Sequence, residues 1–188
     1  MGAPVRPASG LFSDPREIDE LGDLFANVWQ ICWVTSDLDR GMELLRERFG
    51  VEHCVEVPTD GATFLKGDEP AEWEARVAMG ARGGPILELI EPVAGEVDFY
   101  RRFLPADGSA DLRLHHLATF IPLGDDAWAS LEALLARHGL GVDYTVLIPD
   151  RVRAGYVDTT ALLGHWLEVC QLQAADIEFF SGLVAESA

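Results

Sequence analysis

Apolar residues occur along most of this chain in short segments rich in β-branched and aromatic residues, separated by turns that contain Gly, Pro or Asp. This pattern is typical of β-strands. Two segments instead carry apolar residues at helical spacing. The first, 38–49, follows three candidate cap residues, Thr35, Ser36 and Asp37, and stops at Gly50, and the second, 125–138, stops at Gly139. The inward face of the second helix is predicted to hold Trp128, Leu131, Leu134 and Leu135.

The same pattern predicts the remaining elements. Strands are expected at 28–35, 51–57, 72–79 and 85–91, and again at 112–121, 142–148, 154–158 and 165–172. Residues 58–71 are expected to form a turn-rich loop, with a short strand at 62–65 as an option. Helical turns are expected at 98–104, and the apolar residues of 174–185 have helical spacing. The order strand, helix, strand, strand, strand therefore occurs twice.

The two halves also match in sequence. GPILELIE at 84–91 is similar to GHWLEVCQ at 164–171, and VWQICWV at 28–34 is similar to LHHLATF at 114–120. Such self-similarity indicates a duplicated module. We therefore divide the chain into a polar N-terminal arm at 1–22, a first βαβββ module at 23–95, a connector at 96–111, a second module at 112–173 and a C-terminal helix or tail at 174–188.

Superposing the two halves places Gln30 on His116 and Glu88 on Glu168. A carboxylate in the middle of an apolar strand is costly unless it is paired or binds a metal. Because alternate side chains of a strand share a face, all four polar groups can point into one concave surface. Two carboxylates, an imidazole and an amide oxygen suit a borderline divalent ion such as Zn, Ni, Co, Mn or Fe.

The simpler alternative is a pair of hydrogen-bonded carboxylates beside a satisfied core histidine. For a single residue that alternative is favoured, whereas four residues in repeat register favour a metal site. On this hypothesis Gln30, Glu88, His116 and Glu168 are the metal ligands.

Other residues are weaker candidates. Arg76, Tyr156 and Asp158 are predicted to line the pocket and contact substrate, although Arg76 also fits an exposed sheet arginine and Asp158 also fits a cap of the following turn. Strict alternation turns His115 away from His116, as a packing or surface residue, and His165 has the same status. It also places Trp29 and Trp33 between sheet and helix.

Composition limits the partners. The formal charge is −18, with 32 acidic residues against 14 Lys and Arg. Phosphate backbones and anionic membranes would be repelled, so we expect no nucleic-acid or membrane partner. The apolar segments are strand-sized, and no secretory signal is evident. Three scattered cysteines without a CxxC pair favour a reduced, cytoplasmic location.

The duplicated βαβββ order resembles the vicinal oxygen chelate superfamily, which includes glyoxalase I, methylmalonyl-CoA epimerase, extradiol dioxygenases and bleomycin-resistance proteins. The likeness covers about residues 27 to 173. The opening strand with SDLDRG at 36–41, HHLA at 115–118, and the closing strands LEL at 87–89 and LEV at 167–169 are similar to the family's pattern.

The resemblance implies an α+β fold in which two βαβββ modules curl into a half-open barrel around a metal-binding cleft. The family's ligand positions fall on Gln30, Glu88, His116 and Glu168. This set is similar to glyoxalase I, whereas the epimerase usually has His in the first slot and the extradiol dioxygenases need two His and one carboxylate. No counterpart of the glutathione-binding segments of glyoxalase I is evident.

Two functions follow as expectations. The first is a metal-dependent enzyme, a glyoxalase-like lyase or an isomerase or epimerase, that transfers a proton beside a metal-bound carbonyl of a small-molecule substrate. Glu88 or Glu168 would serve as the base. The second is a metal-free protein that sequesters an apolar small molecule in the same cleft.

We predict a homodimer, because the fold is an open sheet whose edges and apolar C-terminal segment need covering. Phe179, Phe180 and Leu183 would supply part of that cover. Light scattering at micromolar concentration should give twice the monomer mass. A clean monomer mass would contradict the prediction and show that the C-terminal segment packs within its own chain.

Overall fold

The computed structural model describes Phe12 and residues 18–187, so most of the predicted N-terminal arm lies outside the described residues. The strands form one sheet in the order β2-β5-β6-β1-β7-β10-β9-β8-β3-β4. Their bounds are β1 Val28–Val34, β2 Cys54–Val57, β3 Thr63–Lys66, β4 Glu69–Pro70, β5 Trp73–Ala81, β6 Ile86–Gly95, β7 Arg113–Phe120, β8 Tyr144–Ile148, β9 Val152–Val157 and β10 Trp166–Leu172.

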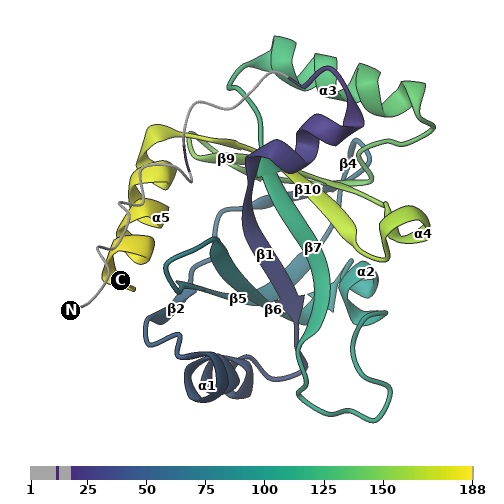
Figure 1. Ribbon diagram of the computed structural model, residues 1–188. Helices are drawn as coiled ribbons and strands as arrows, with labels where there is room; N and C mark the ends of the chain where they lie inside the picture. The colour runs from purple at the N-terminus through teal and green to yellow at the C-terminus, as the bar shows by residue number, and fades with distance from the viewer. Residues whose placement is uncertain (1–11, 13–17, 188) are drawn as a thin grey trace.

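The sheet consists of two equivalent halves joined at its centre. β1 runs parallel to β6, and β7 runs parallel to β10. β1 and β7 pair antiparallel with each other, so a pseudo-two-fold axis passes between them. In Figure 1 these two long strands cross the middle of the molecule side by side. The predicted α+β architecture, with a strongly curled sheet built from two related modules, is confirmed.

A hairpin of the first module crosses to the second. β2 lies at one edge of the sheet, whereas β3 pairs with β8 near the other edge. The connecting residues 58–62 therefore span the open side of the barrel. The turn-rich loop expected at 58–71, with its optional short strand, is in fact the bridge that partly closes the cleft.

Each half carries one helix on its outer face. α1, Leu38–Phe49, is capped by the Asp37 carboxylate, which accepts from the Arg40 N–H, and it ends at Gly50 in the left-handed conformation, φ 66°. α3, Asp125–Arg137, buries the four residues predicted to face inward. Figure 1 shows these helices at opposite ends of the molecule, α1 below the sheet and α3 above it.

The strand predicted at 51–57 begins only at Cys54. Val51 is buried, and its N–H donates to the Leu45 carbonyl as part of the turn that ends α1. Residues that close a helix in this way are not free to pair in a sheet.

The concave side holds two apolar clusters. One contains Trp29, Phe120, Leu172 and, from the C-terminal helix α5 (Ala174–Glu186), Phe180, Leu183 and Val184. The other contains Phe64, Tyr156, Trp166 and, from the short helix α2 (Asp98–Arg101), Phe99 and Tyr100. The cleft lies between them. A 3-10 helix, η1 (Leu21–Asn27), and the one-turn helix α4 (Thr160–Leu163) complete the fold.

Two β-bulges interrupt the central strand pair. On β1 the register shifts between Val28 and Gln30, so Trp29 is the extra residue; on β7 it shifts so that His115 is extra. These positions are equivalent in the repeat, because each immediately precedes a candidate ligand. A bulge turns its extra residue away from strict alternation. The face of the sheet expected for Trp29 is therefore wrong: it lies on the cleft side. It does pack between the sheet and a helix, but that helix is α5, where the Phe180 ring centroid is 4.7 Å from that of Trp29.

Within the described residues, no helix is long and apolar enough to cross a membrane.

We predict that Gly155→Ala destabilises the second module. A Cβ at Gly155 in β9 would lie 2.8 Å from the Trp128 ring and 2.9 Å from Val142, inside a packed layer. Overpacking of this kind costs about 1–3 kcal/mol. Gly22→Ala is the matched control, because nothing lies within 4 Å of its Cβ position. Urea unfolding measures both variants, and equal stability of the two would contradict the packing described for α3.

Candidate metal centre

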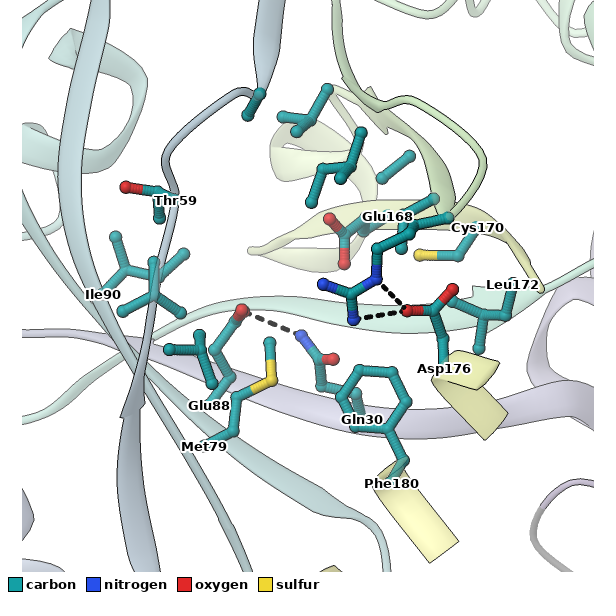
Figure 2. A pocket seen from close by; sticks show the side chains of 18 of the residues that line it. Gln30, Thr59, Met79, Glu88, Ile90, Glu168, Cys170, Leu172, Asp176 and Phe180 are labelled. Carbon is teal, nitrogen blue, oxygen red and sulfur yellow. Dashed lines mark hydrogen bonds and ion pairs between the residues drawn. The ribbon is translucent and has the colours of Figure 1, made fainter. Parts of the chain in front are cut away.

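Four strands bring Gln30, Glu88, His116 and Glu168 together on the concave side of the sheet. Gln30 lies on β1 and His116 on β7, the two central strands, while Glu88 on β6 and Glu168 on β10 flank them. All four side chains are buried. Figure 2 shows Glu88 and Glu168 facing the same space from opposite sides, with Gln30 beside them.

The polar atoms of this cluster are in mutual contact. His116 Nε2 lies 3.3 Å from Oε2 of Glu88 and 3.3 Å from Oε2 of Glu168. Gln30 Nε2 donates a hydrogen bond of 2.7 Å to Glu88 Oε2 and lies 3.5 Å from His116 Nε2. The imidazole nitrogen is thus the centre of the cluster, and it touches one donor group from each of the other three strands.

These distances fit a shared divalent ion. Donor atoms that bind one ion at about 2.1 Å lie about 3.0 Å apart at right angles and about 3.4 Å apart at tetrahedral angles. The contacts of His116 with both carboxylates fall within this range. If the Gln30 amide rotates by half a turn, its oxygen takes the place of its nitrogen. The side chain then offers a neutral metal ligand instead of a hydrogen-bond donor to Glu88. The donor set of two carboxylates, one imidazole and one amide therefore suits a borderline ion.

The electrostatics follow from burying two acids beside one base. Burial raises the pKa of Glu88, and the nearby His116 opposes that shift without overcoming it. Burial also raises the pKa of Glu168, but here the attraction and hydrogen bond of His116 outweigh it, so the net shift is downward. Burial lowers the pKa of His116, yet Glu168 and Glu88 together raise it to about 9. In this cluster the positive charge that balances the acids resides on His116.

Cys32 also adjoins the cluster, and the sequence did not predict this. Its Sγ, a Glu88 carboxylate oxygen and a His116 ring nitrogen all lie within 4.8 Å of one another. Burial and the adjacent Glu88 raise the pKa of the Cys32 thiol. Its position in β1, two residues after Gln30, places it on the cleft face, but an apolar strand cysteine is usually only a small hydrophobe.

His115 also belongs with the cluster. Strict alternation predicted that it faces away from His116, and the β7 bulge is why that expectation is wrong. His115 is fully buried, and its Nδ1 lies 3.0 Å from Nδ1 of His116. Its Nε2 lies 3.1 Å from the carbonyl oxygen of Phe99. The two adjacent histidines are visible in the sequence, but the β-bulge that brings both of them to the cluster is not.

The cluster opens onto a cavity of about 310 Å³. The walls are mainly apolar, and the hydroxyl groups of Tyr100 and Tyr156 donate and accept one hydrogen bond of 3.1 Å between them. Both tyrosines have a pKa raised well above the usual value, first of all by burial. Residues from α5 and from the 58–62 bridge complete the lining: Pro58, Thr59, Ala62, Asp176, Phe179 and Phe180.

One ion pair lies in the cavity wall. Arg151 Nη2 is 2.6 Å from Oδ1 of Asp176, and the Nε–H of Arg151 donates to the same oxygen at 2.9 Å. Figure 2 shows Asp176 projecting from α5, near Leu172. The Asp176 side chain is fully buried while that of Arg151 is half exposed. The pair ties α5 to the β8–β9 turn at the cleft.

The three predicted substrate residues lie in different places. Tyr156 lines the cavity. Arg76 does not; it is held on the surface by Asp39, Glu56 and Glu91. Asp158 accepts from the backbone N–H and hydroxyl of Thr160 and pairs with Arg102, so it caps the turn at the start of α4. His165 is half-buried, with Nδ1 2.7 Å from the Trp166 carbonyl oxygen.

Solved structures show which fold this is. Methylmalonyl-CoA epimerase from Mycobacterium tuberculosis matches with a TM-score of 0.52 at 16% identity, over 80% of this chain and 91% of that chain. A variant of Streptomyces coelicolor methylmalonyl-CoA epimerase in complex with 2-nitronate-propionyl-CoA gives 0.49 at 22% identity, over 78% and 97%. Protein-family models and curated proteins gave no match. The first similarity shows the vicinal oxygen chelate fold and thereby confirms the predicted fold class.

We predict that Glu88→Gln and Glu168→Gln each abolish stoichiometric metal binding and leave the fold intact. Each change keeps the shape of the side chain and removes one of two anions that would balance the ion. Elemental analysis after chelator-free purification should give near one equivalent of metal for the wild type. Glu91→Gln is the matched control and should retain the metal. Glu91 lies on β6, the strand of Glu88, but it pairs with Arg76.

The thermal midpoint supplies the second measurement, because a ligand that binds the native state must raise its stability. Added Zn, Ni, Co, Mn or Fe should raise the midpoint of the wild type and of Glu91→Gln only. A wild type that neither retains metal nor gains stability from any of these ions would refute the metal site.

Proposed function

We propose that this protein is a metal-dependent enzyme of the vicinal oxygen chelate type. It would act on a small molecule by moving a proton next to a carbonyl group, as a glyoxalase-like lyase or as an isomerase or epimerase. The observation that carries the proposal is the convergence of two carboxylates on one buried imidazole, within 3.3 Å on each side, at the wall of a cavity.

Gln30, Glu88, His116 and Glu168 would hold the ion. When bound, a divalent ion supplies a Lewis acid that polarises a substrate oxygen and stabilises negative charge on it. The proton would be taken by a carboxylate oxygen of Glu88 or Glu168, because both residues line the cavity. Asp176 lines it too, but its carboxylate is paired with Arg151. The Gln30 amide donates to Glu88 Oε2 and so orients that carboxylate, and after rotation its oxygen would be a neutral ligand of the ion.

The cavity supports a small, largely apolar substrate. Its walls are formed by side chains such as Trp29, Trp73, Met79, Val146 and Leu172, which exclude water from the reacting carbon. Tyr100 and Tyr156 keep their protons because burial raises their pKa values. The Tyr100 hydroxyl donates to that of Tyr156, so the Tyr156 proton is the one that would be donated to a substrate oxygen. The 58–62 bridge and α5 limit the length of any substrate that enters.

Charge argues against a substrate with several phosphate groups. The chain has a formal charge of −18. Among the described residues that line the cavity, Arg151 is the one Lys or Arg, and Asp176 already neutralises it. A coenzyme A thioester would bring several negative charges to this surface and would be repelled. We therefore propose a substrate that is neutral or singly charged.

The test uses the hemithioacetal of phenylglyoxal and 2-mercaptoethanol, which is small, apolar and uncharged. Protein loaded with each candidate ion should convert it to the thioester or, in D2O, exchange the hydrogen next to its carbonyl. Both Glu88→Gln and Glu168→Gln should lose activity, because each removes a metal ligand. Loss of a general base costs about 10²–10⁴-fold in rate, so the variant that lacks the base should stay below wild type by that amount even when the ion is added in excess. Equal rates for wild type and both variants would exclude either glutamate as the base.

A metal-free binding protein is the second candidate, and the apolar lining of the cavity is the observation that favours it. It predicts tight binding of an apolar dye such as anilinonaphthalene sulfonate to chelator-treated protein, with the same affinity in Glu168→Gln. That result, together with a wild type that binds no metal, would replace the enzyme proposal.

A further inference from the structure

His115 is a buried histidine that the proposed chemistry leaves without a role. It has no exposed surface, and aromatic rings surround it: the centroids of Tyr100, Phe103 and Phe99 lie 4.6, 4.9 and 5.5 Å from its own. Trp166 is stacked on it at 6.2 Å. Both ring nitrogens nevertheless have polar partners, His116 Nδ1 on one side and the Phe99 carbonyl on the other.

The Phe99 carbonyl gives this chain of contacts a direction. A carbonyl oxygen only accepts, so His115 Nε2 must carry a proton and donate. The carbonyl is free to accept because the Phe103 N–H, its partner in a regular helix, bonds the Tyr100 carbonyl instead. Because α2 ends after one turn, the Phe99 carbonyl accepts from His115 Nε2 and not from the helix backbone.

The second step follows from the contact between the two rings. Nδ1 of His115 and Nδ1 of His116 lie 3.0 Å apart, so one of these nitrogens donates a hydrogen bond and the other accepts it. Nε2 of His116 faces Glu88 and Glu168, and an ion bound there would take the place of the Nε2 proton. The remaining ring proton of His116 is then on Nδ1, which donates. Nδ1 of His115, whose own ring proton is on Nε2, is the acceptor.

We propose that His115 is a positioning residue that holds the proton of neutral His116 on Nδ1 and so leaves the lone pair on Nε2, toward Glu88 and Glu168. The chain Phe99 carbonyl, His115, His116 selects the one tautomer of His116 that can ligate an ion at the cluster. Partners of this kind, which orient a ligating histidine through its other nitrogen, contribute to metal affinity. The functional part of the proposal rests on the proposed metal site.

The first module supports this assignment by contrast. Trp29 occupies the bulge position equivalent to His115, and it precedes Gln30 instead of a histidine. An amide has no tautomers, so the Gln30 side needs no such partner. Among the residues that the structure describes, Trp29 Nε1 has no hydrogen-bond partner, and the ring packs against Phe180. A histidine thus stands at the bulge only in the half of the molecule whose ligand is an imidazole.

A nitrogen NMR experiment on metal-free protein tests the hydrogen-bond chain directly. Long-range ¹⁵N–¹H correlation spectra distinguish protonated from unprotonated ring nitrogens in each of the five histidines. The signal lost in His115→Asn identifies His115. We expect a proton on its Nε2 and none on its Nδ1. A proton on Nδ1, or a doubly protonated His115 ring at neutral pH, would overturn the proposal.

Metal affinity tests the consequence. Zn²⁺ and Ni²⁺ dissociation constants, measured by competition with a chelator, should be 10–100-fold weaker in His115→Phe, because the Phe ring fills the space but accepts no hydrogen bond. His115→Asn places an amide oxygen near the position of Nδ1 and should recover most of the loss. His165→Phe is the matched control, since the His165 ring contacts the Trp166 carbonyl and not the cluster, and it should bind the ions like wild type.

The outcomes separate the possible explanations. Thermal unfolding of the metal-free variants shows which of them are folded, and the comparison is made among those. Unchanged affinity in folded His115→Phe, or an equal loss in the Phe and Asn variants, would show that the acceptor atom is not what matters and would overturn the proposal. A wild type that binds neither ion would refute the metal site itself, while the nitrogen spectrum would still decide the tautomer of His115.

Discussion

Two carboxylates are buried against one imidazole at the centre of this sheet, and much of the surrounding structure serves to make that burial possible. Glu88 and Glu168 lie on β6 and β10, the strands that flank the central pair, and both side chains are buried. An uncompensated buried charge would cost several kcal/mol. His116 sits between them, and the amide of Gln30 donates to the same Glu88 oxygen, Oε2, that contacts His116. Charge compensation therefore fixes which face of four strands points inward.

The pseudo-two-fold axis explains how one site arises from two modules. Each module supplies one ligand from its first strand and one glutamate from its last. Neither module has a complete set alone, so the site exists only when β1 pairs with β7. The symmetry is broken where chemistry requires it: an imidazole replaces an amide at one ligand position, and the residue before it changes from Trp29 to His115. The 58–62 bridge and α5 are further asymmetric additions that line the cavity.

Much of this arrangement could be predicted from the sequence. The repeated strand sequences identified Gln30, Glu88, His116 and Glu168 as one cluster. This was possible because the alternation of side chains along a strand is a local property that the strand keeps in any sheet. The helices 38–49 and 125–138 were equally local, marked by Asp37, Gly50 and Gly139 at their ends. The strand that carries Arg76 was also predicted from local sequence. Its contacts were not, because the acids that hold it at the surface, Asp39, Glu56 and Glu91, come from other parts of the chain.

By itself, then, the sequence determined the order of the elements, the duplication and the four inward-facing polar residues. Only the tertiary structure decided the placement of His115 and Trp29, since a β-bulge arises from the register of two strands and neither strand encodes it alone. It likewise decided that β3 pairs with β8 and that Cys32 adjoins Glu88. These features depend on contacts between residues far apart in the chain, and hydrophobic periodicity carries no information about such contacts.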